Sequence, residues 1–318
     1  MNINICQVSL NRDIPLIIEN FKNFKKFYKN INFFIICPKI QLEEFKQKIN
    51  FDEIKIISEE KILEFKKFEM IYKNLSKEIQ YRKQFNKRLK WYYQQALKIT
   101  FSFNFIKETG QNIVIWDADT IILKKISFFK QDVSVKYGNF FEFHKAYYIT
   151  NEYILKKLPS YYISFLNQFI AITKSEYIFF IENFLKEKSQ NISTGEKISE
   201  LIFNSVFNKH KTYNGSLFSE YELIGLSNYL FRNEKQKPIL FLRFGLDGML
   251  NDSQKIIASL FGYKHVTYEH THPNEKSFGM LSRIQSWRGF LKILFKNFVK
   301  FYLRYFKHIL MYNFYRSK

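Results

Sequence analysis

Two carboxylates one residue apart, Asp117 and Asp119, are the residues of this sequence best placed for chemistry. They follow the apolar run 113–116 and precede a second run, 121–123. Carboxylate oxygens are hard ligands that suit Mg²⁺ or Mn²⁺, and two such groups are unfavourable to bury without partners. The pattern therefore predicts a divalent-metal site for a phosphorylated ligand. A competing interpretation is that Asp119 and Thr120 only cap a turn by accepting backbone N–H bonds.

The elements around this pair indicate an α/β fold. Residues 113–116 are typical of a buried strand in a parallel sheet, and open α/β folds bind ligands at the carboxyl ends of such strands. Three earlier strands are predicted at 3–10, 32–37 and 54–58, and helices between them at 14–28 and 42–49. This alternation predicts a mostly parallel sheet flanked by helices. Residues 7–13 contain no glycine, so neither a dinucleotide fingerprint nor a Walker loop follows the first strand.

A helix is predicted just upstream of the acidic pair, within a mostly helical region at 59–105. Its apolar face carries five residues at helical spacing: Phe85, Leu89, Tyr92, Ala96 and Ile99. A neighbouring face carries Arg88, Trp91, Gln95 and Lys98. We expect this second face to look into a pocket beneath strand 113–116. The alternative is an ordinary solvated face.

Further elements are predicted downstream. Alternation places Glu142 and His144 on one face of an extended segment at 140–148. A helix is expected to begin at Ser175 with Glu176 in its first turn. The remaining expectations are strands at 130–135, 161–174, 238–243 and 266–269, and helices at 198–207, 223–231 and 253–261. His270 and His272 have a spacing compatible with metal ligation, although paired histidines before a proline are more typical of a surface.

The composition limits the class of protein. The chain has 318 residues, of which 46% are hydrophobic and 19% aromatic, so it can build a sizeable core and is not disordered. Cys6 and Cys37 lie in apolar runs, which predicts buried thiols in a reducing compartment. The N-terminus lacks the pattern of a signal peptide, and no run of about 18 uncharged apolar residues is present. We therefore expect a cytoplasmic protein without a membrane span.

The net charge of +21 points to an anionic partner, and much of it lies in residues 276–318. This segment holds ten Lys or Arg residues and no acidic residue. Lys292, Lys296, Lys300 and Arg304 recur every four residues among aromatic side chains. The pattern predicts a basic amphipathic helix that follows a domain at 1–275 and associates with the inner face of the cytoplasmic membrane. The alternatives are a helix docked on the core and, less favoured without a recognisable module, nucleic-acid binding.

Four blocks in order resemble a bacterial family of glycosyltransferase-like proteins, DUF6492. The blocks are 91–98 (WYYQQALK), 114–121 (VIWDADTI), 142–147 (EFHKAY) and 219–222 (SEYE), and the resemblance spans roughly residues 1–235. It implies a GT-A-like fold in which an Asp-x-Asp motif and Mn²⁺ or Mg²⁺ bind the diphosphate of a nucleotide-sugar. Asp119 would then be the main metal ligand, and Asp117 would contact the ribose, the metal or its waters. Residues 167–169 depart from the pattern, because they lack a histidine expected there.

The glycosyltransferase interpretation assigns roles to the remaining candidate site residues. An inverting enzyme needs a carboxylate that deprotonates the acceptor hydroxyl. Glu220 and Glu222 stand at the predicted start of a helix, and Glu222 is preferred as this base, the alternative being simple helix capping. Gln95 and Lys98 are candidate donor contacts, and His144 is a candidate third ligand or acceptor contact. The acceptor would be a growing bacterial surface glycan, such as lipopolysaccharide or capsule, or its lipid-linked precursor.

Two other functions compete with this one. A haloacid-dehalogenase-type phosphatase also carries Asp-x-Asp at the end of a strand, with the first Asp as nucleophile. Such enzymes usually place the motif on an early strand, whereas three strands precede it here, and Ile121 stands where they carry Thr or Val. The second competitor is a non-enzymatic protein that binds membrane or nucleic acid and does not need Asp117 or Asp119.

Overall fold

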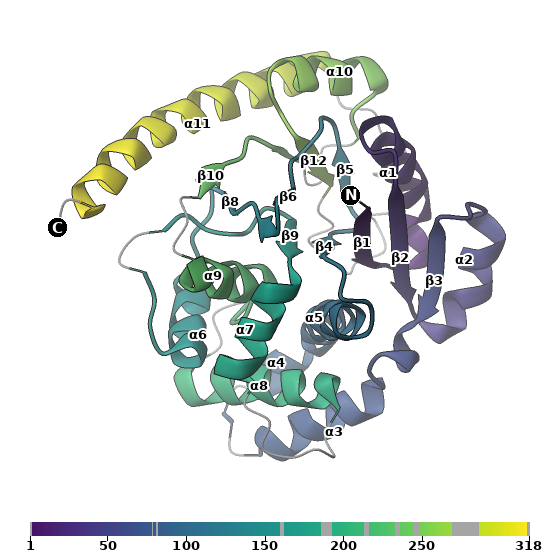
Figure 1. Cartoon of the computed structure of the whole chain (residues 1–318), viewed down its shortest axis with the longest axis vertical. Helices are drawn as coiled ribbons and strands as arrows, with labels where there is room; N and C mark the ends of the chain where they lie inside the picture. Colours follow the sequence, from purple (N-terminus) through teal and green to yellow (C-terminus); the bar gives the residue numbers. More distant parts are fainter. Residues whose placement is uncertain are drawn as a thin grey trace.

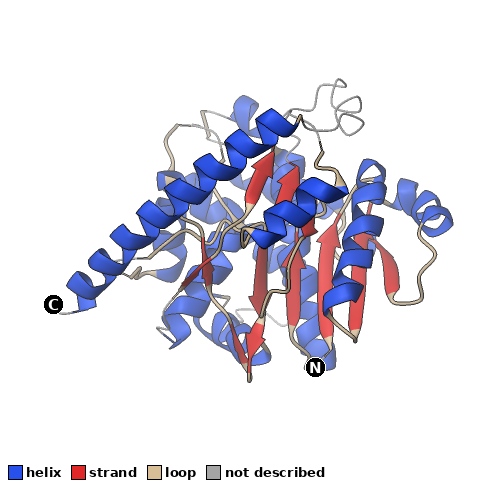
Figure 2. Cartoon of the chain, turned by 90° about the horizontal axis from the view of Figure 1, so that it is seen from above, coloured by secondary structure: helices blue, strands red, loops and turns tan. Residues whose placement is uncertain are grey.

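The structure is α/β, mostly helical, and centred on a mixed five-stranded sheet (Figures 1 and 2). It is a computed structural model that describes residues 2–77, 79–80, 82–159, 162–185, 193–212, 216–232, 236–244, 249–268 and 286–316. His270 and His272 lie outside the described residues. The strands run in the order β3 (Ile54–Ser58), β2 (Ile31–Cys37), β1 (Ile3–Val8), β4 (Ile113–Trp116) and β9 (Phe169–Ile172). The first four are parallel, as predicted, and β9 pairs antiparallel with β4 at the edge.

Alternate side chains of each strand point to opposite faces of the sheet, and a hydrophobic core lies on each face. On one face, Ile5, Phe33 and Trp116 pack with α1 (Ile14–Phe27) and α2 (Leu42–Lys48). On the other face, Cys6, Ile36 and Ile115 pack with a group of helices between residues 65 and 232. Both cysteines are buried free thiols, which confirms that prediction. Because both faces are covered, the central strands β1 and β4 are buried along their whole length.

The second face is covered by two helical layers. The long helix α5 (Leu89–Thr109) packs directly on β1 and β4, and α8 (Thr194–Lys209) packs on α5 from outside (Figure 1). The other members of this group are α3 (Phe65–Leu75), α4 (Arg82–Asn86), α6 (Lys145–Leu155), α7 (Lys174–Phe184) and α9 (Glu220–Arg232). Short 3-10 turns precede several helices: η1 (Asn11–Asp13), η2 (Lys39–Gln41) and η3 (Glu59–Lys61).

A smaller sheet sits beside the main one. It has the order β11 (Leu242–Phe244), β12 (His265–Tyr268) and β5 (Thr120–Ile122). Together with α10 (Asp252–Leu260) and α11 (Trp287–Arg316), it encloses a third hydrophobic core. Two short strand pairs complete the fold, β6 (Phe129–Lys130) with β7 (Val133–Ser134), and β8 (Tyr137–Gly138) with β10 (Lys237–Pro238). In the described part of the chain, no helix is long and apolar enough to cross a membrane.

The segment 140–148 differs from the prediction of an extended strand. Its second half is the start of α6, and His144 is the N-cap of that helix. Phe140 and Phe141 pack on Phe301 of α11, so they are partly buried without strand pairing. Glu142 forms an ion pair with Arg243. The predicted extended segment therefore ends at His144, where α6 begins.

Three further predicted strands and helices have different bounds in the structure. The predicted strand 161–174 is reduced to β9, since Gln168 has a φ of 64° and cannot continue an extended strand. The predicted strand 238–243 is divided between β10 and β11, which belong to different sheets. The helix expected at Ser175 begins one residue earlier, because Thr173 and Glu176 form a capping box around its first turn.

Candidate functional site

The acidic loop 117–119 joins the two sheets at the carboxyl end of β4. Its backbone is fixed on both sides: the Asp117 N–H donates to the Gln168 carbonyl at 2.9 Å, and the Tyr268 N–H donates to the Asp119 carbonyl at 2.9 Å. The Thr120 N–H donates to the Asp117 carbonyl at 3.1 Å and closes a tight turn. Because β4 lies in the main sheet and β5 in the small one, the loop is held at the edge where parallel strands end.

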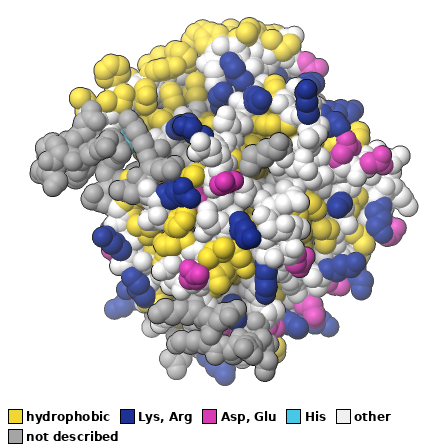
Figure 3. Space-filling view, viewed as in Figure 1, with side chains coloured by type: hydrophobic (Ala, Val, Ile, Leu, Met, Phe, Trp, Pro, Cys, Tyr) yellow, Lys and Arg dark blue, Asp and Glu magenta, His cyan; other side chains and the backbone are white. Residues whose placement is uncertain are grey.

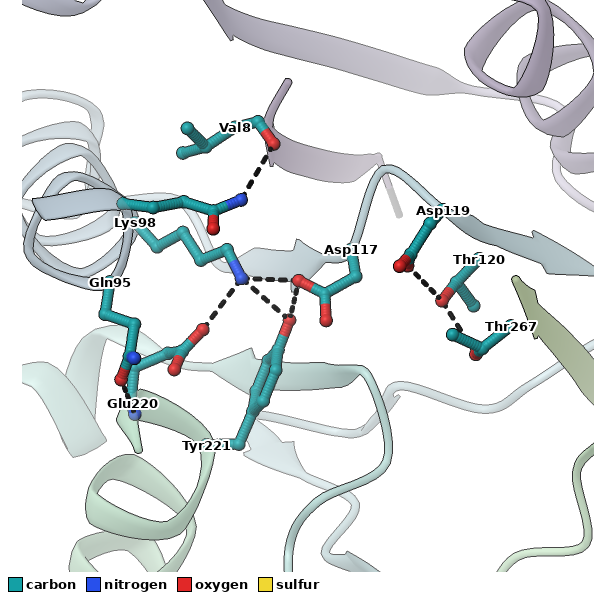
Figure 4. A network of polar contacts seen from close by, with 10 residues as sticks. Val8, Gln95, Lys98, Asp117, Asp119, Thr120, Glu220, Tyr221 and Thr267 are labelled. Atoms are coloured by element: carbon teal, nitrogen blue, oxygen red, sulfur yellow. Dashed lines mark hydrogen bonds and ion pairs between the residues drawn. The ribbon is translucent and has the colours of Figure 1, made fainter. Parts of the chain in front are cut away.

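A buried lysine holds the first carboxylate of the loop (Figure 4). Lys98 of α5 forms ion pairs with Asp117 and with Glu220, the latter at 2.7 Å. The Tyr221 hydroxyl donates to Asp117 Oδ1 at 2.6 Å. Lys98, Glu220 and Tyr221 are each no more than 4% exposed. Four charged or polar groups from α5, α9 and the loop thus form one desolvated network.

The protonation states in this network follow from burial and from the pairing. Burial alone disfavours the charged lysine, but the carboxylates of Asp117 and Glu220 outweigh it and raise the pKa of Lys98, so it is an ammonium. Burial raises the pKa of Glu220, and Lys98 opposes that effect. Burial and the neighbouring carboxylates raise the pKa of Tyr221 well above its usual value. Tyr221 is therefore a hydrogen-bond donor at neutral pH and not a base.

The second carboxylate of the loop lies apart from this network. Asp119 is partly exposed and sits on the far side of Asp117 from Lys98, beside Thr120 and Thr267 (Figure 4). The Thr120 hydroxyl lies 3.3 Å from Asp119 Oδ1 and 2.9 Å from the Thr267 hydroxyl. A partly exposed carboxylate among oxygen-bearing side chains suits a hard divalent ion.

The residues present fit a divalent ion that shares its ligands with a diphosphate. No group of three His, Cys, Asp or Glu side chains in the described part of the chain could hold a metal by itself. Mg²⁺ usually takes only one or two carboxylates from the protein, and waters and substrate phosphates complete its octahedron. Asp119 at the surface, with Asp117 beside it, matches that donor set.

Gln95 is at the site, although it does not project freely into it. Its side-chain oxygen accepts the Glu220 N–H at 3.1 Å, and the residue is 1% exposed. This bond satisfies a backbone donor at the first residue of α9 and fixes that end of the helix against α5. Its neighbour Gln94 donates to the Val8 carbonyl at the end of β1, at 3.4 Å.

Glu222 lies two residues after Glu220 in α9, on the opposite side of the helix and in a separate environment. Its Oε1 accepts hydrogen bonds from the Ser164 hydroxyl and from the Phe165 N–H, the latter at 3.2 Å. Its Oε2 is buried and has no hydrogen-bond partner among the described residues. Burial raises the pKa of Glu222 to about 7, against the effect of those two hydrogen bonds. Both the protonated and the ionised form of this carboxyl group are therefore accessible near neutral pH.

The structure thus brings together four of the predicted site residues, Lys98, Asp117, Gln95 and Glu220, and places Asp119 next to them. The other two lie elsewhere, and Glu222 faces Ser164. His144 is exposed at the start of α6, with its ring 4.8 Å from that of Tyr147, and partial burial lowers its pKa. Sequence reasoning missed Tyr221, although it stands between the two glutamates that were singled out.

Comparison with known proteins places the chain in a family. The family of unknown function DUF6492 matches residues 12–173, just over half of the chain. The matched span includes Lys98 and the acidic loop, and it ends before Glu220 and Tyr221. No curated protein matches the chain. The chain is a member of the DUF6492 family, whose function is unknown.

Proposed function

We propose that this protein is a metal-dependent glycosyltransferase that takes a sugar from a nucleotide-sugar donor. The observation that carries the proposal is the partly exposed Asp119 at the carboxyl end of β4, beside an Asp117 that a buried lysine holds in place. The sheet order, with four parallel strands and an antiparallel edge strand, is compatible with a GT-A-like fold. The acceptor would be a bacterial surface glycan or its lipid-linked precursor.

The geometry supports different roles for the two aspartates. Asp117 already faces the Lys98 ammonium and the Tyr221 hydroxyl, which weakens it as a metal ligand and fixes its orientation. Asp119 would therefore be the main ligand of Mn²⁺ or Mg²⁺, and Asp117 would accept hydrogen bonds from the ribose or from metal-bound water. When bound, the ion supplies Lewis-acid stabilisation of the negative charge on the leaving diphosphate.

Lys98, Glu220 and Gln95 act in this proposal as positioning residues. The Lys98 ammonium is buried and is shared between two carboxylates. It would therefore orient the Asp117 side chain and would not contact the donor. Glu220 keeps that ammonium charged, and Gln95 holds Glu220 through its backbone N–H. A rigid second layer of this kind is what keeps ligand carboxylates in productive geometry.

The assignment of a general base stays a prediction. Glu220 is occupied by Lys98 and Glu222 by Ser164, and each is 3% exposed. The pKa of Glu222, about 7, suits a group that exchanges protons at neutral pH. An acceptor hydroxyl would reach it only through Ser164 or after a rearrangement of the loop at 164–165. His144, exposed near the start of α6, remains a candidate acceptor contact.

The test is a product assay over a panel of nucleotide-sugars with Mn²⁺, Mg²⁺ or a chelator. The proposal predicts metal-dependent release of a nucleoside diphosphate, lost in Asp119→Asn. A haloacid-dehalogenase-type phosphatase would instead release inorganic phosphate from phosphomonoesters and depend on Asp117 as nucleophile. Release of inorganic phosphate alone, or no metal-dependent product from any nucleotide-sugar, would contradict the glycosyltransferase assignment.

A further inference from the structure

An exposed apolar surface runs along residues 295–310 of α11. Phe295, Val299, Leu303, Phe306 and Leu310 lie along it, and each is between 49% and 70% exposed. Figure 3 shows hydrophobic side chains gathered along the upper edge of the molecule, where α10 and α11 lie in Figure 1. Monomeric soluble proteins seldom leave so continuous an apolar strip uncovered, so the strip indicates a binding surface.

This strip is not the core-facing side of the helix. Phe290, Leu294 and Phe301 occupy that side and are buried against the small sheet. The Tyr263 hydroxyl donates to the Leu294 carbonyl at 2.6 Å, and Arg304 donates to the Phe140 carbonyl. The helix is therefore fixed to the body of the protein by one face, and a second apolar face points outward.

The surface continues from α11 onto α10, which the sequence did not indicate. Ile256 and Leu260 of α10 are 61% and 77% exposed. The ring of Phe261, at the end of α10, lies 5.4 Å from Phe295 and 5.8 Å from Phe298, centroid to centroid. These contacts join the two helices into one unit, called here the α10–α11 surface.

A row of cations borders the apolar strip. Lys292, Lys296 and Lys307 each follow an exposed apolar residue by one position, so they lie about 100° further round the helix. Lys300 and Arg304 extend the row toward the body of the protein, where both cations lie over the ring of Phe141. Basic side chains border the hydrophobic band in Figure 3. Residues 276–318 contain no acidic side chain that would neutralise the row.

We propose that the α10–α11 surface docks on an anionic membrane, with α11 lying in the plane of the lipid head groups. Apolar side chains would enter the acyl boundary while the adjacent lysines contact lipid phosphates, as in interfacial amphipathic helices. The uniform positive charge favours a membrane over a second copy of this chain. A symmetric dimer through this face would set the two basic rows against each other.

The docked orientation also fixes where the acidic loop lies. The small sheet stands between α11 and the loop: Tyr263 contacts Leu294 on one side, and the Tyr268 N–H bonds the Asp119 carbonyl on the other. A docked molecule would thus hold the loop at a constant height above the lipid surface. If the proposed glycosyl transfer is correct, this height suits a lipid-linked acceptor, although docking itself does not depend on that activity.

Vesicle flotation of the full chain tests the proposal. We expect the protein to float with vesicles of phosphatidylcholine and phosphatidylglycerol and much less with phosphatidylcholine alone. The double variant Leu303→Asp/Phe306→Asp should lose about tenfold or more in partitioning. Reversing Lys292 and Lys296 to Glu should weaken binding by about fivefold or more per residue on anionic vesicles. Ile40→Asp, which is 93% exposed outside this surface, and Lys83→Glu are matched controls that should float like wild type.

Two further measurements separate this surface from an isolated tail. Ile256→Asp/Leu260→Asp on α10 should also reduce flotation, whereas a tail acting alone would be indifferent to that change. Brominated lipids should quench the fluorescence of Trp287, which is 45% exposed, and Trp287→Phe identifies its contribution. Flotation that is equal for wild type and the α11 variants would overturn the proposal. So would a stable dimer that these variants dissociate in the absence of vesicles.

Discussion

At the scale of single residues, one lysine organises the candidate site. Lys98 is 4% exposed and pairs with two carboxylates that come from opposite sides of it, Asp117 from the β4 end and Glu220 from the start of α9. Buried ion pairs are weak contributors to stability as a whole, but breaking one leaves an uncompensated charge. The sequence predicted a face with Arg88, Trp91, Gln95 and Lys98 that looks into a pocket beneath strand 113–116. In the structure Lys98 reaches Asp117 at the end of that strand, whereas Arg88 bonds Ser216. Nothing in the sequence indicated that Glu220 and Tyr221 complete the network, because their contact with Lys98 spans more than 120 residues.

Replacing the lysine therefore has a larger effect than replacing either acid. Lys98→Met should lower the free energy of unfolding by about 3–5 kcal/mol, since Asp117 and Glu220 would face each other without a cation. Glu220→Gln should have a smaller effect, because Asp117 still pairs with Lys98. Urea unfolding measures both, with Lys90→Met on the exposed face of α5 as the control. A Lys98→Met protein as stable as the control would show that the network is not formed.

Glu222 predicts a pH dependence of stability. Its pKa is about 7 in the folded protein and 4.5 as the ordinary value, so between these values the folded state binds more protons than the unfolded state. The contribution of Glu222 to the free energy of unfolding should therefore be complete below about pH 4.5 and should be lost as the pH rises through about 7. Over this pH range, the titration of Glu222 should lower the free energy of unfolding by on the order of 3 kcal/mol.

The variant Glu222→Gln isolates this effect, because glutamine keeps an oxygen for Ser164 and Phe165 and does not titrate. Relative to wild type it should gain stability when the pH is raised from about 5 to about 8. The comparison is made by urea unfolding at both pH values, with the exposed Glu152→Gln as a control. Parallel pH profiles for wild type and Glu222→Gln would mean that Glu222 is charged in the folded protein.

At the scale of elements, local patterns predicted the strands and helices that are regular and missed those set by distant contacts. The apolar runs of β2 and β3 and the spacing of α1 and α2 were correct within one or two residues. The segment 140–148 alternates like a strand, yet Phe140 and Phe141 are partly buried against α11, which lies some 160 residues further along. The late start of the strand predicted at 161–174 depends on the positive φ of Gln168, and glutamine is not a residue type that predicts such a conformation.

The packing of α9 on the loop at 164–165 supplies a test at this scale. A Cβ added at Gly225 would lie 2.2 Å from Cγ of the buried Phe165, whose N–H bonds Glu222. Alanine normally favours a helix over glycine by about 1 kcal/mol. Here we expect Gly225→Ala to destabilise the protein by about 1–3 kcal/mol, because Phe165 must shift.

The matched comparison is Gly195→Ala in α8, where the nearest atom is the end of the Leu63 side chain at 3.0 Å. That variant should be much less affected. Thermal unfolding of both proteins is sufficient, and a Gly225→Ala variant more stable than wild type would show that α9 does not pack on Phe165 as described.

At the scale of the whole molecule, the acidic loop gains its position from the junction of two sheets. The sequence indicated a parallel sheet and a motif at its carboxyl edge, and both are present. It did not indicate that the second apolar run, at 121–123, enters a different sheet, because pairing with β12 joins residues almost 150 positions apart. Likewise, the tail helix was expected from its own pattern, but its contact with α10 and the small sheet follows only from the tertiary structure.

The most direct test of the central claim is calorimetric titration of nucleoside diphosphates into the protein, with and without Mn²⁺. Wild type is predicted to bind at least one of them in a metal-dependent manner. Asp119→Asn should lower that affinity by about tenfold or more while its unfolding curve stays unchanged, and the exposed Asp52→Asn should bind like wild type. If no nucleotide binds, or if binding is the same without Mn²⁺ and in Asp119→Asn, the acidic loop is not a metal and diphosphate site.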